Sequence, residues 1–591
     1  TEPLARGVIE RLGGPVGRRA LIGRQRWWTP LRVLLTLALT FLALGYLSKA
    51  NCLFGTAETG VNWSGNRPYM SACYNDILPL YSGRGLDDPG DPYAYSWSED
   101  GRLRYMEYPV LAGWFQAILG AVAHYTFPVV RLLLDVPEAS WYFTLTALVL
   151  ACMWLVVIRL VAELAGNRVW DVVLVAASPV IVMHAFTNWD IPSILCAVAA
   201  LVAVKRDAPV WAGVWIGVGT AVKLWPLFLL GAFLVLAVRS NRWRPFLAMT
   251  GAAAVVWLAV NLPVMLAHPE AWGEFNRLNS TRGAEWTTIY QVFTRVTGVD
   301  LSVGFLNTAS FVLFAGACLA VALLGLAARR RPRVAELVFL IVAAFLLFNK
   351  VWSPQYSLWL VVPAVLALPR WRLLLTWMTL ELLMWPATMI FIGAEEGNKI
   401  PAEMFNLLIL ARDGFIVAMA VLVVRQMLGR SRDRVLAAHR GVDVLAGPFG
   451  IDDAPWVAAR ARRSGGRGGG GGGGGARGRR RSGGGAPGGP SRRTRPCAGA
   501  GAPRFPTPPA PTPERRWGGE FRDVGDRLLR ADRVLLPARR LRPVHVRQAT
   551  QVGVAARRAG VRVRDRYPGR HRRLLRLGQQ LGRGHPGEPA P

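Results

Sequence analysis

The sequence predicts an all-α integral membrane protein, and its composition and the spacing of its apolar segments support this fold class. Of the 591 residues, 52% are hydrophobic and only 18% are charged, with a mean hydropathy of +0.28. A soluble chain carries about 25% charged residues. Apolar segments recur between residues 31 and 425, separated by polar connections. We therefore expect one transmembrane domain over residues 31–425 rather than several soluble domains.

The net charge of +33 is concentrated at the C-terminal end of the sequence. Residues 457–591 hold 32 Arg against 7 Asp and Glu, and they contain the unbroken glycine run Gly468–Gly475. No hydrophobic periodicity remains there, so we predict a disordered tail. Two explanations stay open: an extension read out of frame from GC-rich codons, or a basic arm that touches anionic lipid or nucleic acid. Because the charge belongs to the tail, we expect no nucleic-acid partner for the membrane domain.

The expected spans begin after an Arg-rich segment, residues 1–30. This segment has no convincing cleavage site behind it and is expected to stay in the cytoplasm.

The apolar stretch 109–134 is expected to form a re-entrant or interfacial hairpin, since a thirteenth crossing would break the placement of basic clusters in alternate connections. Segments between 191 and 238 are shorter than a straight span of about 20 residues, so we expect tilted or broken helices there. The twelve expected spans are 31–48, 141–163, 168–187, 191–204, 209–222, 225–238, 246–267, 303–328, 334–349, 354–368, 373–393 and 404–425.

Basic clusters set the orientation of these spans, because cytoplasmic connections carry the excess of Lys and Arg. Six clusters fall in alternate connections of the twelve-span arrangement. They are Arg159 with Arg168, Lys205–Arg206, Arg239 to Arg244, Arg329 to Arg333, Arg370 with Arg372, and Arg425 to Arg434. A cytoplasmic juxtamembrane segment, 426–456, would follow. The loops 49–108 and 268–302 then lie outside, which predicts a multi-pass cell-membrane protein whose active site is extracytoplasmic.

Two cysteines, Cys52 and Cys73, share the first outside loop, where a disulfide can persist. We predict a disulfide between them; two free thiols are the alternative. Cys152, Cys196 and Cys318 lie within expected spans and are expected to pack as small apolar residues.

An ordered set of polar and aromatic residues runs through the same loop. Asp76 is followed five residues later by Tyr81, Pro92 precedes Tyr93, and Tyr108-Pro109 opens the next apolar segment. In this order and spacing the chain resembles the GT-C glycosyltransferases over residues 31–425, most closely the family 87 polyprenyl-phosphate-mannose-dependent mannosyltransferases. The family usually has Tyr-Pro-Pro, whereas Val110 follows Pro109 here, which suggests a divergent subgroup.

The resemblance implies a GT-C-like bundle of about 12 transmembrane helices, with a base in the first outside loop at Asp76. Inverting transfer of a sugar requires the acceptor hydroxyl to lose its proton as it attacks, and a carboxylate can accept that proton. The alternative is that Asp76 caps or turns the chain before a short helix. Glu107 is a second carboxylate that could orient the acceptor, or else a solvated loop charge.

Departure of a lipid phosphate develops negative charge, which a cation can stabilise. Lys223 lies between two short apolar segments and is followed by Pro226, a Lys-x-x-Pro pattern that is similar to one in the GT-C group. The alternative is a lysine that snorkels to the interface. Further residues expected to bind substrate come from the same loops and turns. They are Tyr81, Tyr93, Tyr108, Asp190, Arg282, Lys350, Gln355 and Tyr356.

The sequence contains no nucleotide-binding loop and no Cys/His metal spacing, so we expect no cofactor and no metal. The predicted function is transfer of a sugar, with mannose as the expected one, from a polyprenyl-phosphate sugar donor to an envelope glycan or glycolipid acceptor. The lipid bilayer is the third expected partner. A transporter or flippase of lipid-linked sugars is the alternative, since broken helices and intramembrane charge suit transporters as well. A catalytically inactive scaffold is a third possibility.

Overall fold

The computed structural model describes residues 28–99, 101–394, 400–450 and 453–457. These residues form a helical bundle that includes two short β-hairpins. The predicted tail after Val457 and residues 1–27 of the Arg-rich segment lie outside the described residues.

Seven described helices or helical runs are long and apolar enough to cross a membrane, judged by length and composition. They contain α2 (Pro30–Lys49), α5 (Val110–Leu133), α6 (Glu138–Ala165), α12 (Trp243–Ala267), α15 (Val303–Ala327), α18 (Trp371–Gly393) and α19 (Ala402–Met427). Shorter apolar helices accompany them: α9 (Ile191–Lys205), α10 (Pro209–Val222), α11 (Leu229–Ser240), α16 (Val334–Phe348) and α17 (Ser357–Ala367). The protein is thus a multi-pass membrane protein, and the number of twelve spans stays a prediction.

The shorter helices α9, α16 and α17 are apolar on nearly every face and lie in the core of the bundle, as helices without a polar face do.

Two glycines of α10 allow α12 to approach closely. A Cβ at Gly213 would lie 2.1 Å from the Met249 carbonyl oxygen, and one at Gly217 would lie 2.6 Å from that of Ala253. Small residues at such crossings bring two membrane helices into backbone contact.

The expected span 168–187 is broken into η3 (Gly166–Val172), α7 (Val173–Ala176) and α8 (Pro179–His184). Pro179 is the first residue of α8, where its missing N–H would have no helical partner, and the preceding Ser178 has an extended backbone that separates α8 from α7. Two further 3-10 turns precede apolar helices. The turn η4 (Trp225–Phe228) comes before α11 and has a proline at its second residue, and η5 (Pro354–Tyr356) comes before α17 and begins at a proline.

The segment 109–134 is one continuous helix, α5, so the predicted hairpin is wrong. Glycines in this stretch serve close packing instead of a turn: a Cβ at Gly120 would lie 2.4 Å from the Leu86 carbonyl oxygen. The hydrogen bonds that join α5 to α6 involve only the first residues of α6. Trp141 Nε1 donates to Thr126 Oγ1 at 2.8 Å, and Tyr142 OH to the Gln116 carbonyl at 3.5 Å. Helix α5 therefore packs across the end of α6.

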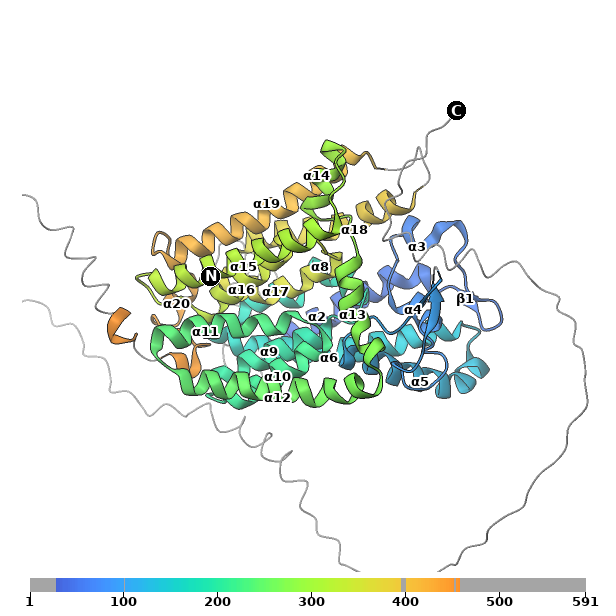
Figure 1. Ribbon diagram of the computed structural model, residues 1–591, viewed down its shortest axis with the longest axis horizontal. Helices are drawn as coiled ribbons and strands as arrows, with labels where there is room; N and C mark the ends of the chain where they lie inside the picture. Colours follow the sequence, from blue (N-terminus) through green and yellow to red (C-terminus); the bar gives the residue numbers. More distant parts are fainter. Residues whose placement is uncertain (1–27, 100, 395–399, 451–452, 458–591) are drawn as a thin grey trace, which may run out of the picture. The chain divides into compact units, whose positions relative to one another are not determined.

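The residues between α2 and α5 gather at one end of the bundle, which we call the loop end; Figure 1 shows α3, α4, α5 and β1 there, on the right. They form η1 (Ala50–Cys52), η2 (Ser64–Asn66), α3 (Arg67–Met70) and α4 (Ile77–Gly83), together with the antiparallel pairs β1 (Gly55–Thr56) with β2 (Gly60–Val61) and β3 (Trp97–Glu99) with β4 (Arg102–Arg104). Cys52 and Cys73 are joined by a disulfide. In the chain-entropy model, a loop of about 20 residues closed in this way contributes roughly 3 kcal/mol.

A second loop packs on the first one at this end. It carries α13 (Pro269–Thr281) and α14 (Ile289–Thr297). Arg104 pairs with Glu274 at 3.3 Å, Tyr105 donates to Glu270 at 2.7 Å, and His268 lies 3.3 Å from Asp91. These contacts tie α13 to the first loop.

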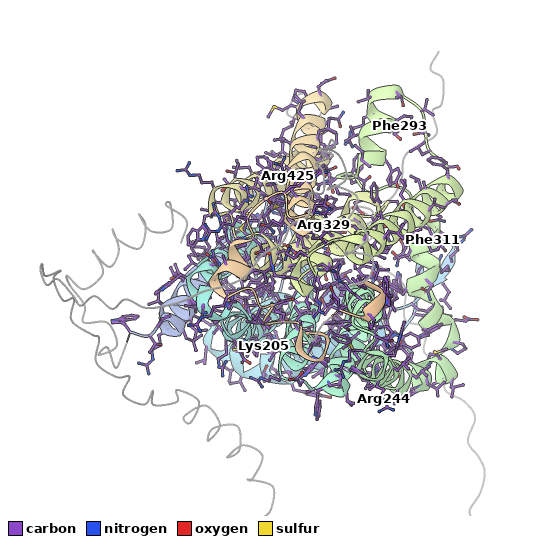
Figure 2. All side chains as sticks on the ribbon, turned by 90° about the vertical axis from the view of Figure 1, so that its left-hand side faces the viewer. Lys205, Arg244, Phe293, Phe311, Arg329 and Arg425 are labelled. Carbon is purple, nitrogen blue, oxygen red and sulfur yellow. A yellow bond between two sulfur atoms is a disulfide. The ribbon has the colours of Figure 1, made fainter. Side chains whose placement is uncertain are left out.

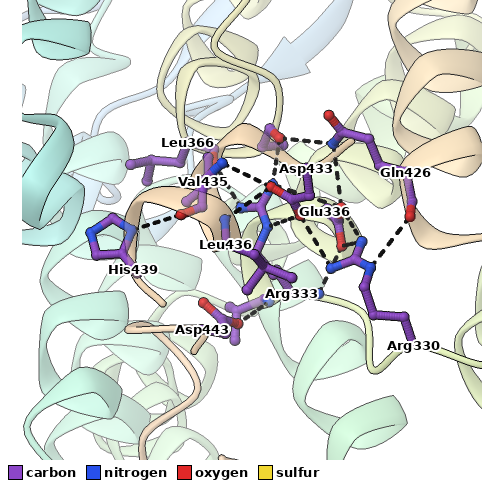
Figure 3. Close-up of polar contacts among 12 residues, drawn as sticks. Arg330, Arg333, Glu336, Leu366, Gln426, Asp433, Val435, Leu436, His439 and Asp443 are labelled. Carbon is purple, nitrogen blue, oxygen red and sulfur yellow. Dashed lines mark hydrogen bonds and ion pairs between the residues drawn. The ribbon is translucent and has the colours of Figure 1, made fainter. Parts of the chain in front are cut away.

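The basic clusters lie at the opposite end, which we call the arginine end; Figure 2 faces it, with Lys205, Arg244, Arg329 and Arg425 labelled. The segment after α19 contains α20 (Arg434–Ala438) and η6 (Gly447–Phe449) and supplies acidic partners to these clusters. Arg333 donates to Asp433 at 2.8 Å, as Figure 3 shows. Asp453 accepts from Arg239 at 2.9 Å and from Arg331 at 2.8 Å. The described residues after α19, 428–450 and 453–457, therefore pack on the membrane domain.

Candidate active site

Asp76 stands at the first turn of α4, and its carboxylate points away from that helix. It occupies the N-cap position without accepting a hydrogen bond from the α4 backbone. The neighbouring Asn75 caps α4 instead, because its Oδ1 accepts a hydrogen bond from the Leu78 N–H at 3.0 Å. The Asp76 N–H donates to the Thr187 carbonyl at 2.8 Å, which fixes the first loop to the connection between α8 and α9.

Two side chains hold the Asp76 carboxylate. Tyr74 OH donates to Oδ1 at 2.9 Å, and Asn188 Nδ2 donates to Oδ2 at 2.5 Å. Burial raises the pKa of the Asp76 carboxyl above its usual value, and the hydrogen bonds from Asn188 and Tyr74 counteract part of that shift. A carboxylate with a raised pKa is a stronger proton acceptor, as a general base requires.

Asn188 connects this carboxylate to a lysine. Its amide nitrogen faces Asp76 and lies 3.1 Å from Tyr108 OH, while its Oδ1 accepts from Lys223 Nζ at 3.0 Å. The short connection between α8 and α9 supplies Asn188, and the end of α10 supplies Lys223. A carboxylate and a lysine therefore lie on the two sides of one amide.

Lys223 is buried and has a second partner in Asp190, whose Oδ1 lies 3.3 Å from Nζ and also accepts from Trp359 Nε1 at 2.8 Å. The ammonium group lies 5.6 Å from the Tyr108 ring centroid. A similar distance, 5.8 Å, separates it from the Tyr356 ring. The lysine is thus held between one carboxylate and two aromatic rings.

Glu107 is paired elsewhere. It accepts a bidentate pair of hydrogen bonds from Arg84, at 2.7 Å from both Nε and Nη2, and Arg84 lies over the Trp97 ring. The structure therefore offers a third role for Glu107, as half of an ion pair within the first loop.

Tyr108 separates the polar cluster from a cavity of about 130 Å³. Tyr93 OH donates to the Tyr108 carbonyl at 2.9 Å and lines the same cavity. Helices α12 and α13 contribute Trp257, Asn261 and Trp272, and Trp272 Nε1 donates to Asn261 Oδ1 at 3.0 Å. Aromatic rings with a few placed amides are a usual lining of small-molecule pockets.

The remaining predicted residues are Tyr81, Arg282, Lys350 and Gln355, which come from different segments of the chain. Tyr81 is outside it, because its hydroxyl donates to Glu138 at 2.9 Å and its ring stacks on Tyr142. Arg282 pairs with Glu285, and the negative charge of Asp76 adds to the rise that burial causes in the pKa of Glu285. Lys350 Nζ donates to the Arg282 carbonyl at 2.6 Å. Gln355 is buried in η5, next to Tyr356.

Three contributors were not among the predicted site residues: Tyr74, Asn188 and Lys49. Asn188 stands beside Asp190 in a polar turn between two apolar segments, and this position was the available signal. Lys49 looked like the ordinary basic end of a span. It is fully buried instead, donates to the Tyr74 carbonyl at 2.9 Å and lies 4.5 Å from the Trp385 ring centroid. Among the described residues, no group of three or more His, Cys, Asp or Glu could hold a metal ion.

The fold and the site define a class: a multi-pass membrane protein with a carboxylate and a cation enclosed at one end of its helix bundle. Residues 106–354 match the model of glycosyltransferase family 87, which confirms the resemblance and indicates a membrane glycosyltransferase. The matched segment contains Tyr108, Asn188, Asp190 and Lys223, and Asp76 lies before it. No curated protein matches the chain.

Proposed function

We propose that this protein transfers a sugar, with mannose as the first candidate, from a polyprenyl-phosphate donor to an envelope glycan or glycolipid on the extracytoplasmic side of the cell membrane. The observation that carries the proposal is the placement of Asp76 and Lys223 on opposite sides of Asn188. Transfer from a lipid phosphate needs a proton acceptor for the incoming hydroxyl and a positive charge for the leaving phosphate.

In the proposed reaction the acceptor oxygen forms a bond to the anomeric carbon while the bond from that carbon to the phosphate oxygen breaks. Asp76 takes the proton of the acceptor hydroxyl, and polyprenyl phosphate leaves with the electron pair. Lys223 faces the developing negative charge. Arg282, which pairs with Glu285 in the second loop, is a second candidate contact for the phosphate.

Turnover by the purified full-length protein tests this proposal. We expect radiolabelled sugar to move from polyprenyl-phosphate mannose to a glycolipid acceptor in detergent or nanodiscs, with release of polyprenyl phosphate. The Asp76→Asn variant is the matched control and should transfer label about 10²–10⁴-fold more slowly. A nucleotide sugar in place of the lipid donor should give no product.

The alternative, a flippase of lipid-linked sugars, predicts a different result. Liposomes that contain the protein would then move the labelled donor between leaflets without acceptor and without release of polyprenyl phosphate. Movement of the donor without transfer, in both wild type and Asp76→Asn, would replace the transferase proposal.

A further inference from the structure

The surface of α19 has an apolar groove near the arginine end, with a volume of about 620 Å³. Its walls come from the second half of α19 and from Leu347 of α16. The α19 residues are Val417, Ala420, Val421, Val424 and Arg425, and Leu428 and Arg430 follow the helix. Val417, Val421 and Leu428 are each at least 40% exposed, as lipid-facing side chains are.

The length of this groove fits one leaflet of a bilayer. From Val417 to Leu428 a helix rises about 16 Å. The hydrocarbon core of a bilayer is about 30 Å thick, so one leaflet is about 15 Å deep. A lipid chain lying along α19 in this groove would reach from the bilayer midplane to the arginine end.

Two cations stand at the polar end of the groove. Arg425 and Arg430 are both exposed, and within the described part of the chain neither guanidinium group has a hydrogen-bond or ion-pair partner. The neighbouring arginines differ in this respect: Arg330 and Arg333 are bound to Glu336 and Asp433. Figure 2 shows Arg425 at the end of the bundle that faces the viewer.

We propose that this groove binds an anionic glycerophospholipid, with an acyl chain along α19 and the phosphate at Arg425 and Arg430. The bilayer supplies such a molecule at this depth, and guanidinium groups bind phosphate oxygens in a geometry that lysine cannot reproduce. Helix α19 also contributes Arg412, which donates to the Thr287 carbonyl and lies 3.5 Å from the Trp352 ring centroid at the loop end. A lipid on α19 would therefore contact the helix that supports the second loop. The binding site itself is independent of the proposed glycosyl transfer.

Native mass spectrometry of the purified full-length protein tests this site. Phosphatidylglycerol and phosphatidylcholine of the same chain composition would be added separately to delipidated protein. We expect one tightly held phosphatidylglycerol, and at least about tenfold weaker retention of phosphatidylcholine.

Matched variants assign the binding to the groove. The double variant Arg425→Gln/Arg430→Gln should weaken phosphatidylglycerol retention about tenfold or more. The control Arg244→Gln/Arg372→Gln removes two exposed arginines from the same end but not from the groove, and should leave retention unchanged. Val421→Trp fills the groove without changing charge and should also reduce retention.

Equal retention of the two lipids would overturn the proposal, because the headgroup would then not be recognised. Equal losses in the groove variant and the control variant would also overturn it, since a diffuse positive surface would explain them. Displacement of the lipid only by polyprenyl phosphate would identify the groove as a substrate path instead.

Discussion

Asn75 caps helix α4 in place of Asp76: the Asn75 Oδ1 accepts the Leu78 N–H at 3.0 Å, while Asp76 holds the N-cap position and gives α4 no side-chain hydrogen bond. The Asp76 carboxylate is therefore left for Tyr74 and Asn188. The capping explanation of Asp76, left open by the sequence, loses its structural basis, and a chemical role remains to be tested.

The two residues should separate function from stability. Asp76→Asn keeps the size of the side chain and removes the proton acceptor, so we expect transfer to fall by about 10²–10⁴. Asn75→Ala removes the cap and should cost about 1 kcal/mol of stability. Transfer assays measure the activity of both variants, and thermal unfolding measures their stability. Near-normal transfer by Asp76→Asn would reject the assignment and make Glu107 the next carboxylate to test.

Asn188 should set the pH dependence of the reaction. Asp76 must be ionised to accept a proton, so activity should fall as the pH drops through its pKa, which burial raises above the usual value. The hydrogen bond from Asn188 lowers that pKa, and Asn188→Ala should therefore move the acid limb of kcat/KM to higher pH. A profile that keeps its shape and position while activity drops would instead mean that Asn188 only positions Lys223.

Lys223 and Asp190 form a buried pair whose structural and chemical roles can be separated. Lys223→Met leaves the Asp190 carboxylate buried without its cation, at a typical cost of about 3–5 kcal/mol. Adding Asp190→Asn removes the unpaired charge and should restore most of the stability. Transfer should stay low in the double variant if Lys223 faces the phosphate. Recovery of transfer together with stability would restrict Lys223 to a structural role.

The orientation of the bundle can be tested by labelling cysteines introduced at its two ends. Gly90 is exposed in the first loop, beside Asp91, and Arg329 is exposed at the arginine end, near Arg331. Positive-inside placement predicts that Gly90→Cys reacts with an impermeant maleimide in intact cells, and Arg329→Cys only after permeabilisation. The reverse labelling would place Asp76 in the cytoplasm and remove the proposed mechanism.

Two truncations should distinguish the tail from the segment before it. A chain ending at Val457 keeps Asp433, Asp443 and Asp453, so we expect normal insertion and transfer. A chain ending at Gly429 removes these partners. The buried Arg239 then loses Asp453, and the buried Arg333 loses Asp433 and keeps only Glu336, at 3.7 Å. This second protein should be poorly folded. Loss of transfer in the longer, well-inserted chain would assign a function to the basic tail.

The sequence by itself determined the membrane class, the approximate bounds of the apolar helices and the family resemblance. Hydropathy and charge act over whole segments, so these features can be read without knowing any contact. Asp76, Asp190 and Lys223 were also named from the sequence, because polar residues at membrane depth or in ordered loop motifs are conspicuous.

Tertiary structure decided which of these residues meet. The sequence separates Asp76 from Asn188 by more than a hundred residues, and only the packing of the first loop on the α8–α9 connection brings them together. The packing of α4 on α6 brings Tyr81 to Glu138, and the fold of the first loop pairs Glu107 with Arg84. Hydropathy could not determine whether 109–134 turns back on itself, because a hairpin and a continuous helix have the same composition; in the fold, Gly120 of the continuous helix packs closely on Leu86. Side-chain partners depend on distances across the fold, and segment composition carries no information on those distances.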